Sequence, residues 1–396
     1  MDRYDAPLEI TGLEWFVCPM PMPHPVRLGT IEYETRDFVA LRLLAASGTE
    51  GHALGYSRGA PVGEAIDMLA GAVIGRPFAG PAAVADRIQG LFVPGWASLA
   101  RGRQPHRDCG LGRGQQGRWG AAAPLPGRAA GSRPTHGGGR YFQDRRTIED
   151  ILEEVASVTA RGFRTVKLLA DGLDIARDIE LVARARELCD DDVRLGLDVH
   201  YAWRSLEQAA EACAALDSLG LAFIEDPCPP GRRRMIQALA RRMRTPLAAG
   251  EDLVDVSQYE DLAELVGVLR VDATVTGGLQ SAWSGADAAA CAGCAVIPHV
   301  FPGVHGPLVA AHPAATDAEV ILPECGTDPF YPLLAAEPVI VDGELVLSTA
   351  PGHGLQLEWV AVAEHASRGG AAGRSPRVDP ASCAAAVSPR TQERGP

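Results

Sequence analysis

The feature that most constrains this chain is a set of seven ionisable residues that recur at similar spacing, each at the end of an apolar run. In order they are Lys167, Asp198, Glu225, Glu251, Asp272, His299 and Glu324, at intervals of 31, 27, 26, 21, 27 and 25 residues. A barrel of about 250 residues in eight β/α units has roughly 31 residues per unit, and fewer where loops are short. Polar loops after strands would account for only one or two of the seven. The spacing therefore predicts a (β/α)₈ barrel, in which all seven residues lie around the C-terminal mouth.

The sequence between these residues alternates between strand and helix patterns. We expect helices over 147–161, 174–188 and 205–220, and strands over 165–169, 193–199 and 222–225. Ser205 followed three residues later by Gln208 is a capping-box pattern, and Gly220 is typical of a helix end. Strands that alternate with helices in this way form parallel sheets, which is the arrangement of the barrel.

The two ends of the chain have a different pattern. Residues 1–96 predict a smaller α+β domain, with strands over 29–35 and 38–44, a turn at 48–51, and helices over 62–74 and 82–90. We assign residues 141–334 to the barrel and residues 335–364 to a C-terminal segment. Residues 365–396 are rich in Ala, Arg, Ser, Gly and Pro, which predicts a disordered tail.

An atypical Gly/Arg-rich segment, residues 97–140, lies where the first barrel strand and the helix before it should be. Between residues 101 and 140 there are 11 Gly and 8 Arg but no Val, Ile, Phe, Tyr, Lys or Glu, so this stretch can bury little apolar surface. Two explanations stay open: a frameshift in a GC-rich gene, or a genuine flexible insertion. Resequencing the gene tests the first, because a single clean reading frame would contradict it.

Composition narrows the partners and the location. The chain has 50 acidic and 37 basic residues, a net charge of −13, which argues against nucleic acid as a partner. The start of the chain lacks the apolar core of a signal peptide, and no apolar run reaches the roughly 18 residues of a membrane helix. The one CxxC pair among nine cysteines, Cys291 and Cys294, falls in an alanine-rich helical pattern and predicts core residues. We expect a cytoplasmic protein with no membrane partner.

Three of the seven residues form a candidate metal site. Asp198, Glu225 and Glu251 end three consecutive strands, and three carboxylates aimed at one point repel one another unless a cation joins them. Hard oxygen ligands select Mg²⁺, or Mn²⁺, over zinc. Such an ion leaves positions for substrate oxygens and stabilises an enolate formed beside a substrate carboxylate.

Three others form candidate acid–base groups. Asp272 and His299 end the strands that follow, and a carboxylate paired with an imidazole orients the ring and raises its pKa. This pairing makes His299 a general base that can return the proton as an acid. Lys167 can hold a substrate carboxylate or lower the pKa of a neighbour, and an ordinary solvated lysine is the alternative.

Short motifs around these residues resemble those of a known family. Leu-Asp-Val-His at 197–200, Phe-Ile-Glu-Asp-Pro at 223–227 and Ala-Gly-Glu-Asp at 249–252 resemble the three metal-ligand motifs of the enolase superfamily. Val-Asp-Ala at 271–273, with two glycines at 277 and 278, and Pro-His-Val-Phe at 298–301 resemble the Asp–His dyad of its mandelate racemase branch. The resemblance covers roughly residues 10–95 and 141–360.

The resemblance implies further features of the fold and site. Residues 1–96 would cap the barrel mouth, and the C-terminal segment would return to that cap. The loop at 20–25 and the turn near Tyr56 would close over the substrate, with His24, Tyr56 and Arg58 as substrate contacts.

Two other residues are candidates for supporting the substrate. Glu324 resembles the eighth-strand glutamate that supports the substrate or the enolate oxygen in the family. His200 lies two residues after Asp198, so we expect it to point the same way along the strand and to contact substrate.

One departure from the family pattern bears on the reaction. The family usually carries Lys-x-Lys at the second strand, and this chain has Leu169 in place of the second lysine. Racemisation needs a base on each face of the α-carbon, whereas a dehydratase can work with His299 alone. The resemblance therefore implies a Mg²⁺-dependent dehydratase of a sugar acid or similar α-hydroxy carboxylate, acting on a small-molecule substrate as a homo-oligomer.

Three alternatives are open. The first is a racemase or epimerase on the same scaffold. The second is a catalytically inactive homologue with a damaged segment at 97–140, and the third is a metal-dependent hydrolase barrel. The last usually has a His-x-His pair at an early strand, which this sequence lacks.

Overall fold

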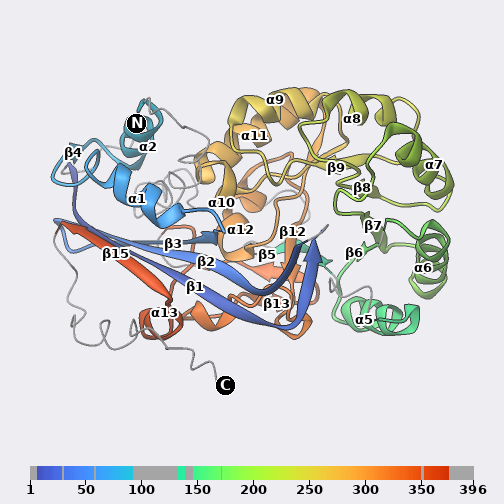
Figure 1. The fold of residues 1–396 in the computed structure, drawn as a ribbon, viewed down its shortest axis with the longest axis horizontal. Coiled ribbons are helices and arrows are strands. Elements are labelled where there is room, and N and C mark those ends of the chain that lie inside the picture. The colour runs from blue at the N-terminus through green and yellow to red at the C-terminus, as the bar shows by residue number, and fades with distance from the viewer. Residues whose placement is uncertain are drawn as a thin grey trace, which may run out of the picture.

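The computed structural model describes residues 7–28, 31–57, 59–91, 132–138, 146–170, 172–348 and 352–373. The chain forms an antiparallel sheet flanked by two helices and, beside it, a parallel barrel with helices outside (Figure 1). In the part of the chain described here, no helix is long and apolar enough to cross a membrane.

The antiparallel sheet joins the two ends of the chain. Its strands are ordered β15-β1-β2-β3, with bounds Leu8–Leu28 (β1), Ile31–Ala45 (β2), Glu50–Tyr56 (β3) and Arg368–Gly373 (β15). A two-residue strand, β4 (Pro77–Phe78), pairs with the start of β1. Helices α1 (Val62–Ala70) and α2 (Pro81–Gln89) pack on this sheet and share one apolar core with it.

Alternation along the strands gives this sheet two apolar faces. On β2, Val39 and Leu41 pack with α1 and α2 in one core. Phe38 and Ala40 instead join the core of the barrel, as does Tyr56 of β3. Because successive side chains of a strand point to opposite faces, this pattern places one face of the sheet against the barrel and the other against the two helices.

The sheet differs from the sequence-based expectation in two ways. The strands expected at 29–35 and 38–44 belong mostly to one strand, β2, and the loop expected at 20–25 lies within β1. The resemblance to the family implied that loop. The prolines are compatible with a strand, because Pro19 and Pro21 are two residues apart and their nitrogens turn to the same edge. The other edge stays paired with β2, with a register shift between Pro21 and Val26.

The barrel consists of eight parallel strands. They are β5 (Ser132–Gly138), β6 (Thr165–Leu169), β7 (Arg194–Asp198), β8 (Phe223–Glu225), β9 (Leu247–Ala249), β10 (Val268–Leu269), β11 (Ala295–Val296) and β12 (Ala318–Ile321). Neighbours pair in chain order from β5 to β11, and β12 pairs with β5. A parallel bridge between Val296 and Ala315 connects β11 to the chain just before β12. The predicted barrel with an α+β domain is confirmed.

The helices between the barrel strands follow the alternation of strand and helix that the sequence predicted. They are α5 (Ile148–Ala160), α6 (Ile175–Leu188), α7 (Leu206–Leu216), α8 (Arg233–Ala240), α9 (Val256–Ala263), α10 (Ala273–Thr276), α11 (Leu279–Ala292) and α12 (Pro302–Ala311). Thr147 begins α5 through a capping box with Asp150, and Ser205 accepts a hydrogen bond from the Gln208 backbone at the start of α7. Asp174 caps α6 in the same way. Caps of this kind explain why the predicted starts of α5, α6 and α7 lie within one residue of those observed.

The first barrel strand comes from the atypical Gly/Arg-rich segment. Strand β5 pairs in register with β6 on one side and β12 on the other, with His136 opposite both Thr165 and Glu319. The other residues of 97–140 lie outside the described part of the chain, so the frameshift hypothesis stays a prediction.

The C-terminal segment returns to the antiparallel sheet. A hairpin of β13 (Val339–Val341) and β14 (Glu344–Val346) pairs with β5, and α13 (Trp359–His365) precedes β15. The sequence predicted a disordered tail from residue 365, but residues 368–373 form β15 and pair with β1. The small residues that suggested disorder fit the sheet, because a side chain at Gly370 would collide with the ring of Trp15. Residues 374–396 lie outside the described part.

Candidate active site

Three buried carboxylates meet at the ends of β7 and β8. Asp198, Glu225 and Asp226 each place one oxygen within 4.8 Å of the others, and all three are buried. One oxygen of Glu225 and both oxygens of Asp226 make no hydrogen bond within the described structure. Since buried carboxylate oxygens without partners are costly, this arrangement fits a hard divalent cation that prefers oxygen ligands.

The pKa shifts of these carboxylates fit a site that binds a cation. Burial raises the pKa of Glu225 to about 7, although Arg270 and Lys167 oppose the shift. Burial also raises the pKa of Asp226 well above its ordinary value, and the charges of Glu251, Glu225 and Asp198 add to that shift. Carboxylates in such surroundings bind either protons or a cation.

The predicted ligand Glu251 lies close to this cluster but is not among the three most closely spaced groups. It follows β9 after Gly250, whose φ of 129° is accessible mainly to glycine. Its Oε2 lies 3.5 Å from Nε2 of His299. Asp226, which the sequence motif contained but which we did not predict as a ligand, occupies the third place in the cluster. The ligand role of Glu251 stays a prediction.

The predicted Asp–His pair is brought together. Nδ1 of His299 lies 2.8 Å from Oδ2 of Asp272, and both side chains are buried. The other oxygen of Asp272 accepts a hydrogen bond from the backbone of Thr274 at the start of α10. Burial opposes the charged imidazole, but Glu251 and Asp272 outweigh it and raise the pKa of His299. Because Nδ1 is held by Asp272, Nε2 is the nitrogen available for proton transfer.

Lys167 is the centre of a buried ionic network. Its Nζ lies 2.9 Å from Glu225, 2.8 Å from Glu319 and 3.3 Å from Asp198. Burial opposes its charge, but these carboxylates together raise the pKa of Lys167 well above its ordinary value. The lysine is therefore a fixed positive charge, and the alternative of a solvated lysine is wrong.

Two members of this network were missed by sequence reasoning. Arg270 pairs with Glu225 and Glu319, and its guanidinium donates to the backbone oxygen of Ile297 at 3.0 Å. These two members, Arg270 and Glu319, are fully buried. Their signals were present: Arg270 lies two residues before Asp272, and Glu319 is a single charge within the buried strand β12.

The turn after His299 is held from two sides. Val300 and Phe301 adopt φ values of 47° and 43°, which are unfavourable for such residues. The backbone N–H of Val300 donates to Glu319 at 2.9 Å, and Nδ1 of the buried His305 lies 2.7 Å from the Val300 carbonyl. Nε2 of His305 accepts from the backbone of Ala273 at 3.0 Å. His305 thus connects the turn after His299 to the residue after Asp272.

The structure does not bring Glu324 to the site. Strand β12 ends at Ile321, and Pro323 begins a 3₁₀ turn, Pro323–Cys325, that directs Glu324 outward. Its side chain is 47% exposed and lies 2.6 Å from Arg161. The resemblance placed the eighth-strand glutamate at Glu324, whereas the buried glutamate of the eighth strand, β12, is Glu319.

The predicted substrate contacts are only partly described. The ring of Tyr56 lies 6.1 Å from that of His299. His200 does not continue the strand, because its φ is 47°, and its backbone N–H donates to Asp198; strand alternation therefore does not determine its direction. Arg58 lies outside the described residues, and His24 belongs to β1 but its side chain is not described.

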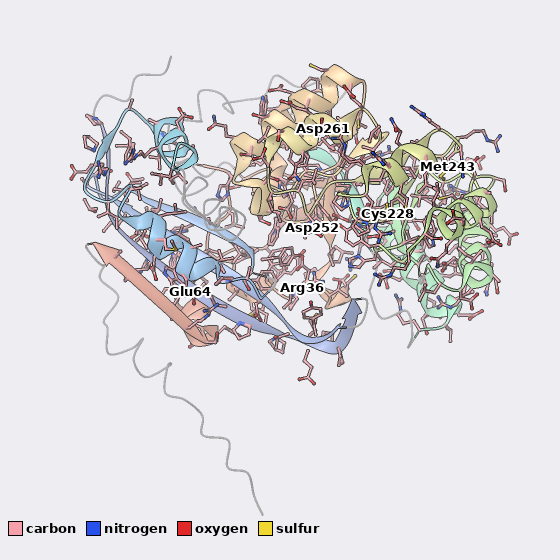
Figure 2. All side chains as sticks on the ribbon, turned by 45° about the horizontal axis from the view of Figure 1, so that its top comes forward. Arg36, Glu64, Cys228, Met243, Asp252 and Asp261 are labelled. Carbon is pink, nitrogen blue, oxygen red and sulfur yellow. The ribbon has the colours of Figure 1, made fainter. Side chains whose placement is uncertain are left out.

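Figure 2 shows the antiparallel sheet and the barrel on either side of the candidate active site. Arg36, from β2, and Asp252, which follows Glu251, are labelled in the middle of the view, between the antiparallel sheet and the barrel. Glu64 on α1 and Met243 beyond α8 mark the two sides of the molecule. Arg36 of β2 therefore lies on the side of the sheet that meets the barrel, where its Nη1 is 3.5 Å from Asp328.

Comparisons with known proteins place the barrel sequence in a family. A model of the family described as enolase C-terminal domain-like matches residues 150–361, more than half of the chain. Arabinonate dehydratase from Saccharolobus solfataricus is 25% identical over 167 residues, 42% of this chain and 44% of that protein. The chain thus spans less than half the length of this relative.

Two other similarities extend over most of the chain. L-Ala-D/L-Glu epimerase from Bacillus subtilis is 22% identical over 334 residues, 79% of this chain and 87% of that protein. The crystal structure of L-talarate dehydratase from Polaromonas sp. JS666, complexed with Mg and L-glucarate, superimposes with a TM-score of 0.79. It is 23% identical and covers 93% of this chain and 100% of that chain, which establishes the shared fold.

Proposed function

The chain belongs to the enolase C-terminal domain-like family, in the mandelate racemase branch of the enolase superfamily, and on that premise we propose that it is a Mg²⁺-dependent dehydratase of a sugar acid or related α-hydroxy carboxylate. The observation that carries the proposal is the Asp272–His299 pair beside a cluster of buried carboxylates. A proton acceptor next to a cation site is what removal of a proton α to a carboxylate requires.

The proposed metal ligands are Asp198, Glu225 and Glu251, with Asp226 as a further oxygen donor in the cluster. When bound, Mg²⁺ would neutralise these carboxylates and draw electron density from a substrate carboxylate, which makes its α-proton more acidic. The unpartnered oxygens of Glu225 and Asp226 support this assignment.

His299 carries both proton transfers in this proposal. Nε2 takes the α-proton, so that the C–H bond breaks and an N–H bond forms. The electron pair forms a double bond to the β-carbon, and the β-hydroxyl leaves with the proton that His299 returns, as water. The resulting enol tautomerises to a 2-keto-3-deoxy acid. Asp272 supports the cationic imidazole between the two transfers.

Lys167 acts as a charge rather than as a base. Its three carboxylate partners keep it protonated, so it is poorly suited to remove a proton from the opposite face of the α-carbon. Leu169, in the position of the family's second lysine, is buried and has no ionisable group. Both features favour a reaction with one base. Glu319 and Arg270 hold Lys167 and the turn after His299 in place.

A turnover screen tests the proposal. The chain with Mg²⁺ is offered a panel of aldonic and aldaric acids, and 2-keto products are detected with semicarbazide. We expect at least one acid to be dehydrated, and we expect His299→Asn to lose at least about 1000-fold in turnover while Mg²⁺ binding persists. Substantial activity in the variant would contradict the role of His299, and a soluble, Mg²⁺-binding protein inactive on every acid would contradict the reaction.

A second candidate is an epimerase, which the similarity to the Bacillus subtilis enzyme over 79% of this chain favours. It requires a second base that neither Lys167 nor Leu169 provides. In deuterated water an epimerase would incorporate deuterium into recovered substrate at both configurations of the α-carbon, whereas the proposed dehydratase would not. A cytoplasmic location and a homo-oligomeric state also stay predictions of the sequence.

A further inference from the structure

Asp328 lies where the antiparallel sheet meets the loop that follows the last barrel strand. Its side chain is fully buried. The hydroxyl of Tyr56 donates to Oδ1 of Asp328 at 2.7 Å, and Nη1 of Arg36 lies 3.5 Å from the same oxygen. Arg36 and Tyr56 come from β2 and β3, so both known partners of this carboxyl group approach from the sheet.

The second oxygen of Asp328 is unusual. Oδ2 is buried and has no hydrogen-bond partner within the described structure. Leaving a buried polar atom unpaired costs roughly 1–3 kcal/mol, and more for a charged group. If Asp328 served only to join the sheet to the barrel loop, Oδ1 would be sufficient, and no group in the described part of the chain would offset the cost of Oδ2.

Asp328 is close to the proposed base. The ring of Tyr56, which bonds to Asp328, lies 6.1 Å from the ring of His299. Burial raises the pKa of Asp328, while Arg36, Tyr56 and the charge of His299 oppose that shift.

The other neighbours on this side are aromatic and apolar. Phe38 packs edge-on against Phe301 and Phe330, with ring centroids 6.3 and 5.8 Å apart. These three rings are almost completely buried and offer no hydrogen bond. None of these rings offers a polar partner to Oδ2 of Asp328.

We propose that Oδ2 of Asp328 binds a hydroxyl group of the substrate beyond its α-carbon and so determines which hydroxy acids are accepted. This rests on the proposed function, which supplies the α-hydroxy carboxylate. A hydroxyl suits this oxygen because it both donates and accepts hydrogen bonds, and therefore pairs with the carboxyl group in either protonation state. A methylene in the same place would leave Oδ2 unpaired, and buried groups left unpaired in this way strongly disfavour the deoxy analogue.

The test uses pairs of ligands that differ by one hydroxyl: glycerate against lactate, and pentonates against their deoxy forms. Dissociation constants are measured calorimetrically with Mg²⁺ for the full chain and for Asp328→Asn and Asp328→Leu. We expect the unaltered chain to favour the hydroxylated member of at least one pair by about tenfold or more. Asp328→Leu should bring that ratio close to one, and Asp328→Asn, which keeps an acceptor for Tyr56 and a polar atom at Oδ2, should retain most of it.

The ratio separates recognition from a structural tie. If Asp328 only holds the sheet on the barrel, Asp328→Leu will weaken both members of each pair equally and leave the ratio unchanged, which overturns the proposal. No preference, or no binding of any of these acids, by the unaltered chain also overturns it. Glu337→Gln, which removes an exposed carboxylate of the C-terminal segment, is the matched control and should keep the ratio.

Semicarbazide assays on the same samples separate this proposal from the dehydratase proposal. Binding with the expected ratio but without keto product would contradict the dehydratase and leave the role of Asp328 standing. Keto product with a ratio that is unchanged in Asp328→Leu would contradict the role of Asp328 and leave the dehydratase standing.

Discussion

Two buried ionic groups, one in the antiparallel sheet and one at the barrel mouth, are built in opposite ways. In the sheet, Glu14 of β1 and Arg42 of β2 are cross-strand partners, with Arg42 Nη2 2.6 Å from Glu14 Oε2. The guanidinium also lies 3.8 Å from a carboxylate oxygen of the partly exposed Glu50 and 4.6 Å from the ring of Trp359. Of the two carboxylates only Glu14 is buried, so one buried acid faces one buried cation.

The barrel mouth holds an excess of acid. Lys167 and Arg270 are the cations of the network, against buried carboxylates at Asp198, Glu225, Asp226, Glu251 and Glu319. Among the described residues, one oxygen of Glu225 and both oxygens of Asp226 have no hydrogen-bond partner. The difference is one of balance: buried acid and buried base match in the sheet pair, whereas the barrel cluster holds more negative charge than the described residues neutralise.

The strongest way to break this comparison is to remove a carboxylate from the barrel cluster. We expect Asp198→Asn or Glu225→Gln to lower turnover by about 10³-fold, because groups that stabilise developing charge contribute on this scale. Both should also abolish the rise in melting temperature that Mg²⁺ gives the unaltered chain. Arg42→Met is the control that should keep this Mg²⁺ response, and a normal response in Asp198→Asn would contradict the assignment of the cluster.

The sheet pair should respond in stability rather than in metal binding. Arg42→Met leaves Glu14 buried without its cation, and we expect a loss of about 3–5 kcal/mol in the free energy of unfolding by urea. Replacing both residues, as Glu14→Leu with Arg42→Met, should recover most of that loss. If the double variant were no more stable than the single one, packing on Trp359 rather than the unpaired charge would be the cause.

A pH-dependent contact joins the C-terminal segment to the sheet. His353 lies 3.2 Å from the carbonyl of His52, and burial lowers the pKa of His353 to about 4. The unfolded value is near 6.5, so the contribution of neutral His353 is complete above that pH and is lost as the pH falls toward 4. We expect a loss of about 3 kcal/mol over this range, measured by urea unfolding. His353→Gln should flatten the profile, and the exposed His365→Asn should not.

Because the barrel cluster holds more acidic than basic groups, removing one negative charge from it should stabilise the metal-free protein. Asp226 is surrounded by other carboxylates and has unpaired oxygens, so Asp226→Asn should raise the unfolding free energy of the metal-free protein by about 1 kcal/mol. With saturating Mg²⁺ the same variant should be less stable than the unaltered chain. A loss of stability in the absence of metal would show that the charge of Asp226 is compensated by the chain itself.

The smallest effect is expected at Glu324. Its pair with Arg161 is half exposed, and such surface pairs contribute about 0–1 kcal/mol. Glu324→Gln should therefore change the free energy of unfolding by less than about 1 kcal/mol and turnover by less than about twofold. A large loss of turnover would restore the role that the resemblance gave to Glu324, whereas a large loss in Glu319→Gln would support the interior glutamate.

Local signals were enough for much of this structure. Residues 165–169 form β6 as predicted, and Thr147 and Asp174 begin helices because each side chain caps the backbone that follows it. The sheet was harder to predict. The resemblance implied a loop at 20–25, but this stretch belongs to β1 beside β2. The glycine-rich β15 had the composition of a tail, because its stability comes from β1 at the other end of the chain.

The sequence by itself determined the barrel and the meeting of Asp272 with His299, since strand periodicity and the register of parallel strands bring residues at equivalent strand ends to the same mouth. Only the tertiary structure decided that Glu319 rather than Glu324 points inward, because β12 ends at Ile321 and the 3₁₀ turn Pro323–Cys325 carries Glu324 to the surface. It also decided that Tyr56 and Arg36 reach Asp328. Those contacts join residues more than 270 positions apart, and no local preference of the chain encodes them.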